Sequence, residues 1–291
     1  MSGRARPAGS VATAVIVTHT HPEQTTEALA SAVAAARAAG CVLAAPRQEF
    51  DKHGEAAAGI APLEELEGDP DLCLVLGGDG SILQALRRWS GTDVPVLGIN
   101  FGTIGFLAAH DRGELAPGLD AAFAGEFDVM PMPGLLPDVE VDFPVALNDV
   151  SFVRRPHGRV AELSYSLAGD ELGRVRCDGL VAATPAGSTG YNLANSGPVL
   201  AWGVEGYVVS FIAPHTLTAR ALVAAPGDTL VVSNATGREA VDIALDGAPV
   251  AALESGSEVE ISYRPDMACL AQAPGSTFYH RMREKFGRLA R

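Results

Sequence analysis

An uninterrupted apolar run, Leu72-Cys73-Leu74-Val75-Leu76, ends on the paired glycines Gly77 and Gly78. Such a run is typical of a strand that is buried in a parallel sheet, and the glycines predict a turn with backbone angles closed to residues that carry side chains. We expect Ser81 to cap a helix that begins at this turn and continues through Leu86. The glycines and the first free amides of that helix would form a phosphate-binding seat at the carboxyl end of the sheet.

Asp79 stands inside this seat, between Gly78 and Gly80, where a carboxylate would repel a bound phosphate. Two functional interpretations follow: Asp79 helps to hold a metal ion between phosphates, or it accepts a proton from an attacking hydroxyl as a general base. A third interpretation is turn chemistry, in which the side chain bonds only the nearby backbone. The apolar strand before the motif and the helical pattern after it favour a functional role.

The charge balance limits the class of partner. The chain has 291 residues with a formal net charge of −14, and 47% of its residues are hydrophobic. This composition predicts a compact globular protein, and the negative charge argues against nucleic acid or an anionic membrane as a partner. An anionic small molecule would need a cation or a cluster of amides to receive it, which favours Mg²⁺ or another divalent metal as a cofactor.

The cysteines and the apolar segments indicate a cytoplasmic protein. The four cysteines are scattered, with no Cys-x-x-Cys pair, so we expect reduced thiols and no zinc site. No apolar run approaches the length of a membrane span, and the short apolar segment after Ser10 does not resemble a signal sequence.

The first part of the chain alternates strand and helix patterns. We predict strands over 14–17, 41–45, 72–76 and 94–99, helices over 23–39 and from Ile82, and a polar connection around residues 52–55. This order predicts an open α/β sheet in an N-terminal nucleotide-binding domain, residues 1–128. A second glycine-spaced loop follows, Asn100-Phe101-Gly102-Thr103-Ile104-Gly105-Phe106-Leu107, and can form the wall opposite Asp79.

From residue 129 the pattern changes to short strands separated by turns. Strands are expected over 162–167, 171–175, 206–211, 229–232, 241–245 and 257–263, which suggests a sandwich-like all-β domain over 129–276 that binds the dinucleotide. The last segment, 277–291, predicts an amphipathic helix that packs back on the first domain, with Phe278, Met282, Phe286 and Leu289 on one face.

Two places in the predicted β domain carry polar residues where a core strand would not. Asn148 and Asp149 lie in a strand pattern and could bond the hydroxyls of a sugar, although a turn or a bulge explains such a pair equally well. The loop from Thr184 to Asn192 gathers hydroxyls and amides at the end of an apolar strand. His19, His21 and His215 are better explained as structural or loop residues than as metal ligands, and Arg154 with Arg155 as a solvated pair.

Together these motifs resemble the NAD kinase family, in its bacterial type. The resemblance is carried by the order and spacing of motifs along nearly the whole chain: Gly77-Gly78-Asp79-Gly80-Ser81, Gly98 to Leu107, Leu147-Asn148-Asp149, Asp178-Gly179, Thr184 to Tyr191, Pro214-His215, Leu245-Asp246-Gly247 and Phe278 to Gly287. The first motif alone would also fit lipid kinases of the diacylglycerol and sphingosine type.

The resemblance implies transfer of the γ-phosphoryl group of ATP to the 2′-hydroxyl of the adenosine ribose of NAD, which gives NADP. It assigns Asp79 as the proton acceptor and Gly78, Gly80 and Ser81 to the phosphates. It further implies these dinucleotide contacts: Phe106 at the adenine, Asn148 and Asp149 at the nicotinamide ribose, and Asp178, Thr189, Gly190 and Tyr191 along the site.

A homodimer or homotetramer is also implied by the resemblance. Two alternatives stay open, a lipid kinase and a non-catalytic dinucleotide-binding paralogue. The segment from Met130 to Pro137 departs from the family pattern by its prolines, and two interpretations stay open, a changed hinge between the domains and a changed affinity.

Overall fold

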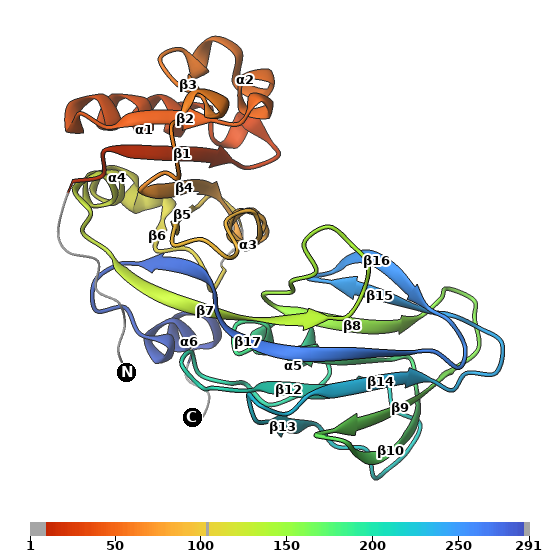
Figure 1. Cartoon of the computed structure of the whole chain (residues 1–291). Coiled ribbons are helices and arrows are strands. Elements are labelled where there is room, and N and C mark those ends of the chain that lie inside the picture. Colours follow the sequence, from red (N-terminus) through yellow and green to blue (C-terminus); the bar gives the residue numbers. More distant parts are fainter. Residues whose placement is uncertain (1–9, 103–104, 288–291) are drawn as a thin grey trace. The chain divides into compact units, whose positions relative to one another are not determined.

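The computed structural model describes residues 10–102 and 105–287, and it divides into two compact units (Figure 1). The first, which we call the α/β unit, comprises Met1–Pro131 with Ala268–Arg291. The second, the β unit, comprises Met132–Met267. Two long strands, β7 (Asp128–Pro137) and β17 (Glu258–Gln272), cross from one unit into the other, so the chain returns to the α/β unit at its end.

The α/β unit is built on a parallel sheet. Its strands are hydrogen-bonded in the order β3-β2-β1-β4-β5-β17, and β6 also pairs with β5. The elements are β1 (Thr13–Thr18), α1 (Thr26–Ala39), β2 (Val42–Ala45), α2 (Arg47–His53), β3 (Ala61–Pro62), β4 (Leu72–Gly77), α3 (Asp79–Arg88), β5 (Pro95–Asn100), β6 (His110–Asp111), α4 (Leu115–Ala124) and α6 (Phe278–Phe286). Five short 3-10 helices complete the described elements of the whole chain: Pro22–Gln24, Gly54–Ala57, Leu63–Glu65, Arg112–Glu114 and Gly187–Thr189.

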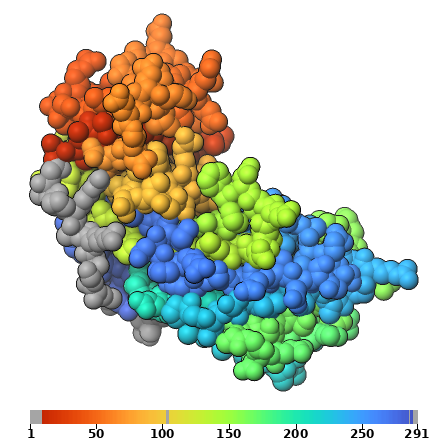
Figure 2. All heavy atoms as spheres, in the orientation of Figure 1, coloured from red at the N-terminus to blue at the C-terminus, as the bar shows by residue number. Residues whose placement is uncertain are grey.

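Helices cover both faces of this sheet, as the alternation of side chains along its strands requires. Leu72, Leu74 and Leu76 of β4 share one core with α1 and α4. On the other face, a Cβ at Gly98 of β5 would lie 2.3 Å from the end of the Ile82 side chain on α3. The red and orange atoms of the first elements form one continuous body in Figure 2. The predicted α/β architecture is therefore confirmed.

One segment predicted as a polar connection is a helix. The prediction around residues 52–55 was wrong because α2 buries two of its polar side chains four residues apart, Glu49 and His53. The hydroxyl of Thr18, at the end of β1, donates to Oε2 of Glu49 at 2.5 Å and lies 2.8 Å from Nε2 of His53. A polar face that is buried against a polar strand end gives no amphipathic signal.

The β unit contains two antiparallel sheets. One has the strand order β13-β12-β11-β8-β15-β16, and the other joins β10, β9, β14 and the first part of β17. The remaining bounds are β8 (Asp149–Arg154), β9 (Ala161–Leu167), β10 (Asp170–Cys177), β11 (Gly179–Ala183), α5 (Tyr191–Ala194), β12 (Tyr207–Ile212), β13 (Leu222–Ala224), β14 (Leu230–Asn234), β15 (Val241–Leu245) and β16 (Ala248–Leu253).

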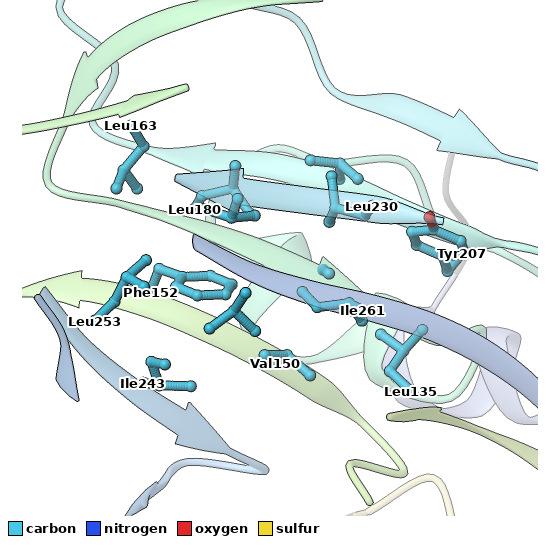
Figure 3. Close-up of a cluster of buried hydrophobic side chains, with 14 of the residues drawn as sticks. Leu135, Val150, Phe152, Leu163, Leu180, Tyr207, Leu230, Ile243, Leu253 and Ile261 are labelled. Atoms are coloured by element: carbon cyan, nitrogen blue, oxygen red, sulfur yellow. The ribbon is translucent and has the colours of Figure 1, made fainter. Parts of the chain in front are cut away.

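The core of the β unit lies between these sheets (Figure 3). Phe152 and Leu180 come from one sheet and Leu163 and Ile261 from the other, and all four side chains are fully buried. Burial of one such side chain stabilises a fold by about 1.5–3 kcal/mol. The apolar side chains between the two sheets therefore hold the sheets together as the sandwich that the sequence predicts.

The proline-rich segment that departs from the family pattern is the strand β7. Pro131, Pro133 and Pro137 all lie within its bounds, and Leu135 forms a bridge with Ala146 through both of its backbone groups. The prolines exclude a helix here, as expected, but they do not prevent an extended strand.

The C-terminal helix α6 belongs to the α/β unit, as predicted. Its Phe278 and Met282 are buried, whereas Phe286 is partly exposed and Leu289 lies outside the described residues. Within the described part of the chain, no helix is both long and apolar enough to cross a membrane.

Candidate active site

A cavity of about 780 Å³ opens at the carboxyl ends of β4 and β5 in the α/β unit. It is lined by both glycine-rich loops and by the end of β1, through His19, Gln24, Gly78, Asp79, Gly80, Phe101, Gly102 and Gly105. Because ligands of open α/β sheets bind outside the carboxyl ends of the strands, this is the expected position for a nucleotide site. The second loop helps to line the cavity, as predicted, but it contacts Asp79 directly instead of facing it from the opposite wall; its Thr103 and Ile104 lie outside the described residues.

The glycines of the first loop take no unusual backbone angles, and only Gly77 is needed for close approach, since a Cβ there would lie 2.7 Å from Cβ and Oγ of Ser81. Gly78 has a φ of −89° and is itself the N-cap of α3, which begins at Asp79. A Cβ at Gly102 would lie 3.1 Å from the Cα of Gly78, so the two loops touch backbone to backbone. Both the expectation of closed angles and the expectation that Ser81 caps the helix were therefore wrong, since Ser81 lies in the first turn.

Asp79 is held by the second loop. Its Oδ2 accepts the N–H of Phe106 at 2.6 Å, and its Oδ1 accepts the N–H of Leu107 at 3.0 Å. A Cβ at Gly105 would lie 1.9 Å from Oδ1 of Asp79, so the carboxylate occupies the space that a side chain at this position would need. The carboxylate lies at the N-terminus of α3, where the helix dipole stabilises negative charge.

The ring of Phe106 packs on the C-terminal helix. Its centroid lies 6.4 Å from that of Phe278 and 5.6 Å from that of Phe286. The backbone of Phe106 therefore contacts Asp79 while its side chain contacts α6. Its predicted contact with adenine stays a prediction.

In the β unit, Asn148 and Asp149 are fixed from both sides. The carboxylate of Asp246 accepts the N–H groups of Leu147, Asn148 and Asp149 at 3.1, 2.6 and 3.1 Å, and the N–H of Asp246 donates to the carbonyl of Asp149. Thr184 donates its hydroxyl to the carbonyl of Leu147 at 2.6 Å and its N–H to that of Asn148. Two residues thus bond all six backbone polar groups of 147–149.

The side chain of Asp149 is buried and close to another carboxylate. Burial, and then the charge of Asp246, raise the pKa of Asp149 to about 7. Burial, and then the charges of Asp149 and Asp178, raise the pKa of Tyr191, so these three predicted residues lie near one another.

The other predicted residues have local partners. Oδ1 of Asp178 accepts Nε–H of Arg154 at 2.5 Å, and the hydroxyl of Thr189 donates to the carbonyl of Ala186 at 3.0 Å. Gly190 precedes α5, which begins at Tyr191. Arg154 is therefore paired with a predicted site residue, and its neighbour Arg155 pairs with Asp242.

Two residues that line the cavity, His19 and Gln24, were not predicted as site residues from the sequence. Phe101 lies in the predicted second loop, whereas Asp246 and Thr184 belong to motifs of the family resemblance whose role in fixing the Asn148–Asp149 pair was not predicted. The Asp246-Gly247 pair gave a usable signal, because Asp-Gly between two strand patterns predicts a two-residue turn, and both residues have positive φ, 51° and 80°. His19 follows a buried strand, which is a weaker signal.

The residues present fit a metal that binds together with phosphates. Among the residues described, no group of three or more His, Cys, Asp or Glu side chains could hold a metal ion by itself. Asp79 nevertheless presents a carboxylate to the cavity, and Mg²⁺ is commonly bound by one or two carboxylates plus substrate phosphates.

Comparison with known proteins decides the family. Residues 42–127 match the profile described as the ATP-NAD kinase N-terminal domain, and residues 147–271 match that of the ATP-NAD kinase C-terminal domain. The chain belongs to the NAD kinase family. The suspected resemblance is thereby confirmed.

Relatives in this family are similar over most of the chain. The NAD kinase of Rhodopirellula baltica is 36% identical over 222 residues, which cover 75% of this chain and 71% of that protein. The NAD kinase of Symbiobacterium thermophilum is 36% identical over 231 residues, 77% of this chain and 81% of that protein.

Two solved structures share the fold. Yeast NADH kinase complexed with NADH has a TM-score of 0.81 at 20% sequence identity, covering 97% of this chain and 89% of that one. An NAD kinase from Archaeoglobus fulgidus in complex with ATP has a TM-score of 0.71 at 23% identity, covering 94% of this chain and 97% of that one.

Proposed function

We propose that this protein is an ATP-dependent NAD kinase, which transfers the γ-phosphoryl group of ATP to the 2′-hydroxyl of the adenosine ribose of NAD. Family membership supports the reaction. The observation that carries the chemistry is the position of Asp79, a carboxylate at the edge of a glycine-lined cavity at the carboxyl end of the sheet.

The reaction needs positioning and charge neutralisation more than covalent chemistry. The 2′-oxygen attacks the γ-phosphorus, the bond between that phosphorus and the β,γ-bridging oxygen breaks, and ADP leaves. Asp79 accepts the proton of the 2′-hydroxyl. Gly78, Gly80 and Ser81 belong to the first turn of α3 and its cap, where backbone N–H groups and the helix dipole favour phosphate.

We assign the dinucleotide contacts to the predicted residues. Asn148 and Asp149 would bond the ribose at the nicotinamide end, while Asp178, Thr189, Gly190 and Tyr191 would line the dinucleotide site and Phe106 would contact the adenine. The support is the fixed backbone of the Asn148–Asp149 pair and the proximity of Asp149, Asp178 and Tyr191.

Mg²⁺ or another divalent metal would enter with ATP as part of the substrate. When bound, the metal neutralises charge on the phosphates, and Asp79 is the cavity carboxylate that could contact it. A cytoplasmic location is proposed from the scattered cysteines, which are free thiols in the structure. A homodimer or homotetramer is supported by the family resemblance, and light scattering would test it.

The activity is tested by incubating the purified chain with ATP and Mg²⁺, together with either NAD or a diacylglycerol. We expect NADP, with the new phosphate identified on the 2′-oxygen by phosphorus NMR, and no phosphorylated lipid. Lipid phosphorylation without NADP would make the chain a lipid kinase. Binding of NAD without turnover in the presence of ATP and Mg²⁺ would make it a non-catalytic paralogue.

A further inference from the structure

Arg281 of α6 is a buried cation whose hydrogen bonds lead toward Asp79. It is 7% exposed, and its NH1 group donates to the carbonyl of Phe106 at 3.3 Å and to that of Ala108. Its Nε donates to the hydroxyl of Ser276 at 3.3 Å. A buried charge is costly unless it is bonded, so these carbonyls are needed to stabilise it in place.

A second side chain near the C-terminus completes this set. Nε2 of Gln272, the last residue of β17, donates to the carbonyl of Leu107 at 2.8 Å. The three consecutive carbonyls of residues 106–108, which we call the retaining segment, are therefore bonded by two side chains from the end of the chain. The N–H groups of Phe106 and Leu107, in the same segment, bond the carboxylate of Asp79.

Electrostatics couple the same groups. Burial is the largest influence on Arg281 and lowers its pKa, while the charges of Glu284, Asp79 and Asp111 act in the opposite direction. Arg281 therefore lies close enough to Asp79 for their charges to interact. The aromatic contacts of Phe106 with Phe278 and Phe286 attach the same segment to α6 through its side chain.

We propose that Arg281, assisted by Gln272, is a positioning residue for Asp79: it fixes the carbonyls of the retaining segment so that the amides of that segment hold the carboxylate in its reactive orientation. Arg281 acts through the retaining segment and is not itself a catalytic residue. This inference rests on the proposed function, because it concerns the orientation of the proton acceptor in that reaction.

The test compares Arg281→Met with Arg283→Met, which removes an exposed arginine two residues further along the same helix. A displacement of about 1 Å in a catalytic group can cost about 100-fold in rate. We expect Arg281→Met to lower kcat about 10- to 100-fold, beyond any change in the Kd for NAD that follows from the proposed contact of Phe106, and Arg283→Met to leave both within about two-fold. Equal activity of the two variants would overturn the proposal.

A double variant separates positioning from general damage. If Arg281 acts through Asp79, adding Arg281→Met to Asp79→Asn should lower the remaining rate by less than about two-fold. Losses that multiply in the double variant would overturn the proposal. Should Arg281→Met not fold, Gln272→Met removes the other donor to the retaining segment. Adding Gln272→Met to Asp79→Asn should then also lower the remaining rate by less than about two-fold.

Hydrogen exchange gives a readout that does not depend on kinase activity. We expect the amides of Phe106 and Leu107 to exchange at least about ten-fold faster in Arg281→Met than in the parent or in Arg283→Met. Unchanged exchange would overturn the proposal. If the parent makes no NADP, the proposed function fails, and the exchange measurement still tests whether Arg281 holds the retaining segment.

Discussion

The carboxylate of Asp79 occupies the space that a side chain at Gly105 would need. Oδ1 of Asp79 lies 1.9 Å from the point where a Cβ of Gly105 would be. Adjacent amides at Phe106 and Leu107 reach the carboxylate only because this space is empty. The glycine is thus required by the position of the acid.

Substitution of Gly105 by alanine should therefore displace Asp79. We expect Gly105→Ala to lower kcat about 100-fold, because a shift of about 1 Å in a catalytic group costs about that much. Gly113→Ala is the matched control, since a Cβ at Gly113 meets nothing within 4 Å. Steady-state kinetics on both variants check this, and a Gly105→Ala enzyme with parental kcat would contradict it.

Burial of Asp149 makes the stability of the β unit depend on pH. With its pKa raised to about 7, Asp149 keeps its proton in the folded state at pH values where the unfolded chain, with a pKa near 4, has lost it. The stabilisation from this group is therefore present below about pH 4 and is lost as the pH rises to about 7. The difference amounts to roughly 4 kcal/mol over about three pH units.

Asp149→Asn should remove this contribution to the pH dependence. We expect Asp149→Asn to gain stability relative to the parent as the pH rises. Its free energy of unfolding minus that of the parent should be larger at pH 8 than at pH 5. Urea denaturation at the two pH values measures it. A difference between variant and parent that does not change with pH would show that Asp149 is ionised throughout.

At the scale of elements, the turn between β15 and β16 positions the start of the neighbouring strand β8, which is about 100 residues away in the sequence. Asp246 bonds three consecutive amides at the start of β8, and its left-handed backbone is compatible with a two-residue turn. The hairpin that carries the Leu245-Asp246-Gly247 motif therefore supports the predicted ribose contact. Its removal should affect NAD binding before it affects chemistry.

We expect Asp246→Ala to raise the KM and Kd for NAD about ten-fold or more while the KM for ATP stays near the parental value. Each buried amide left without an acceptor costs about 1–3 kcal/mol, so the variant should also melt at a lower temperature. Asp266→Ala is the control, because Asp266 is exposed and has a similar φ, 55°. Equal effects of the two substitutions would contradict the positioning role of Asp246.

Elements with a clear periodic signal were predicted well. The apolar runs of β1, β4 and β5 gave the parallel sheet, and alternation gave β9, β10, β14 and β15 close to their observed bounds. The helix α2 was missed because its buried residues are polar, and the start of α3 was misplaced because Gly78, with no side chain to mark it, serves as the cap.

At the scale of the whole molecule, the fold followed from the sequence more completely than the site did. The predicted domain boundaries at 128 and 276 can be compared with compact units that divide after Pro131 and after Met267. Motifs located Asp79 and the Asn148–Asp149 pair. They could not reveal that Arg281 and Gln272 reach the retaining segment, because those contacts join residues more than 160 positions apart.

The central claim is that Asp79 accepts the proton when the chain phosphorylates NAD. The most direct measurement is the rate of NADP formation by Asp79→Asn, with NAD binding measured by calorimetry and with Asp120→Asn, an exposed aspartate on α4, as the control. We expect the rate to fall about 100- to 10,000-fold for Asp79→Asn, NAD binding to stay within a few-fold of the parent, and the control to match the parent. A parental rate of NADP formation by Asp79→Asn would contradict the claim.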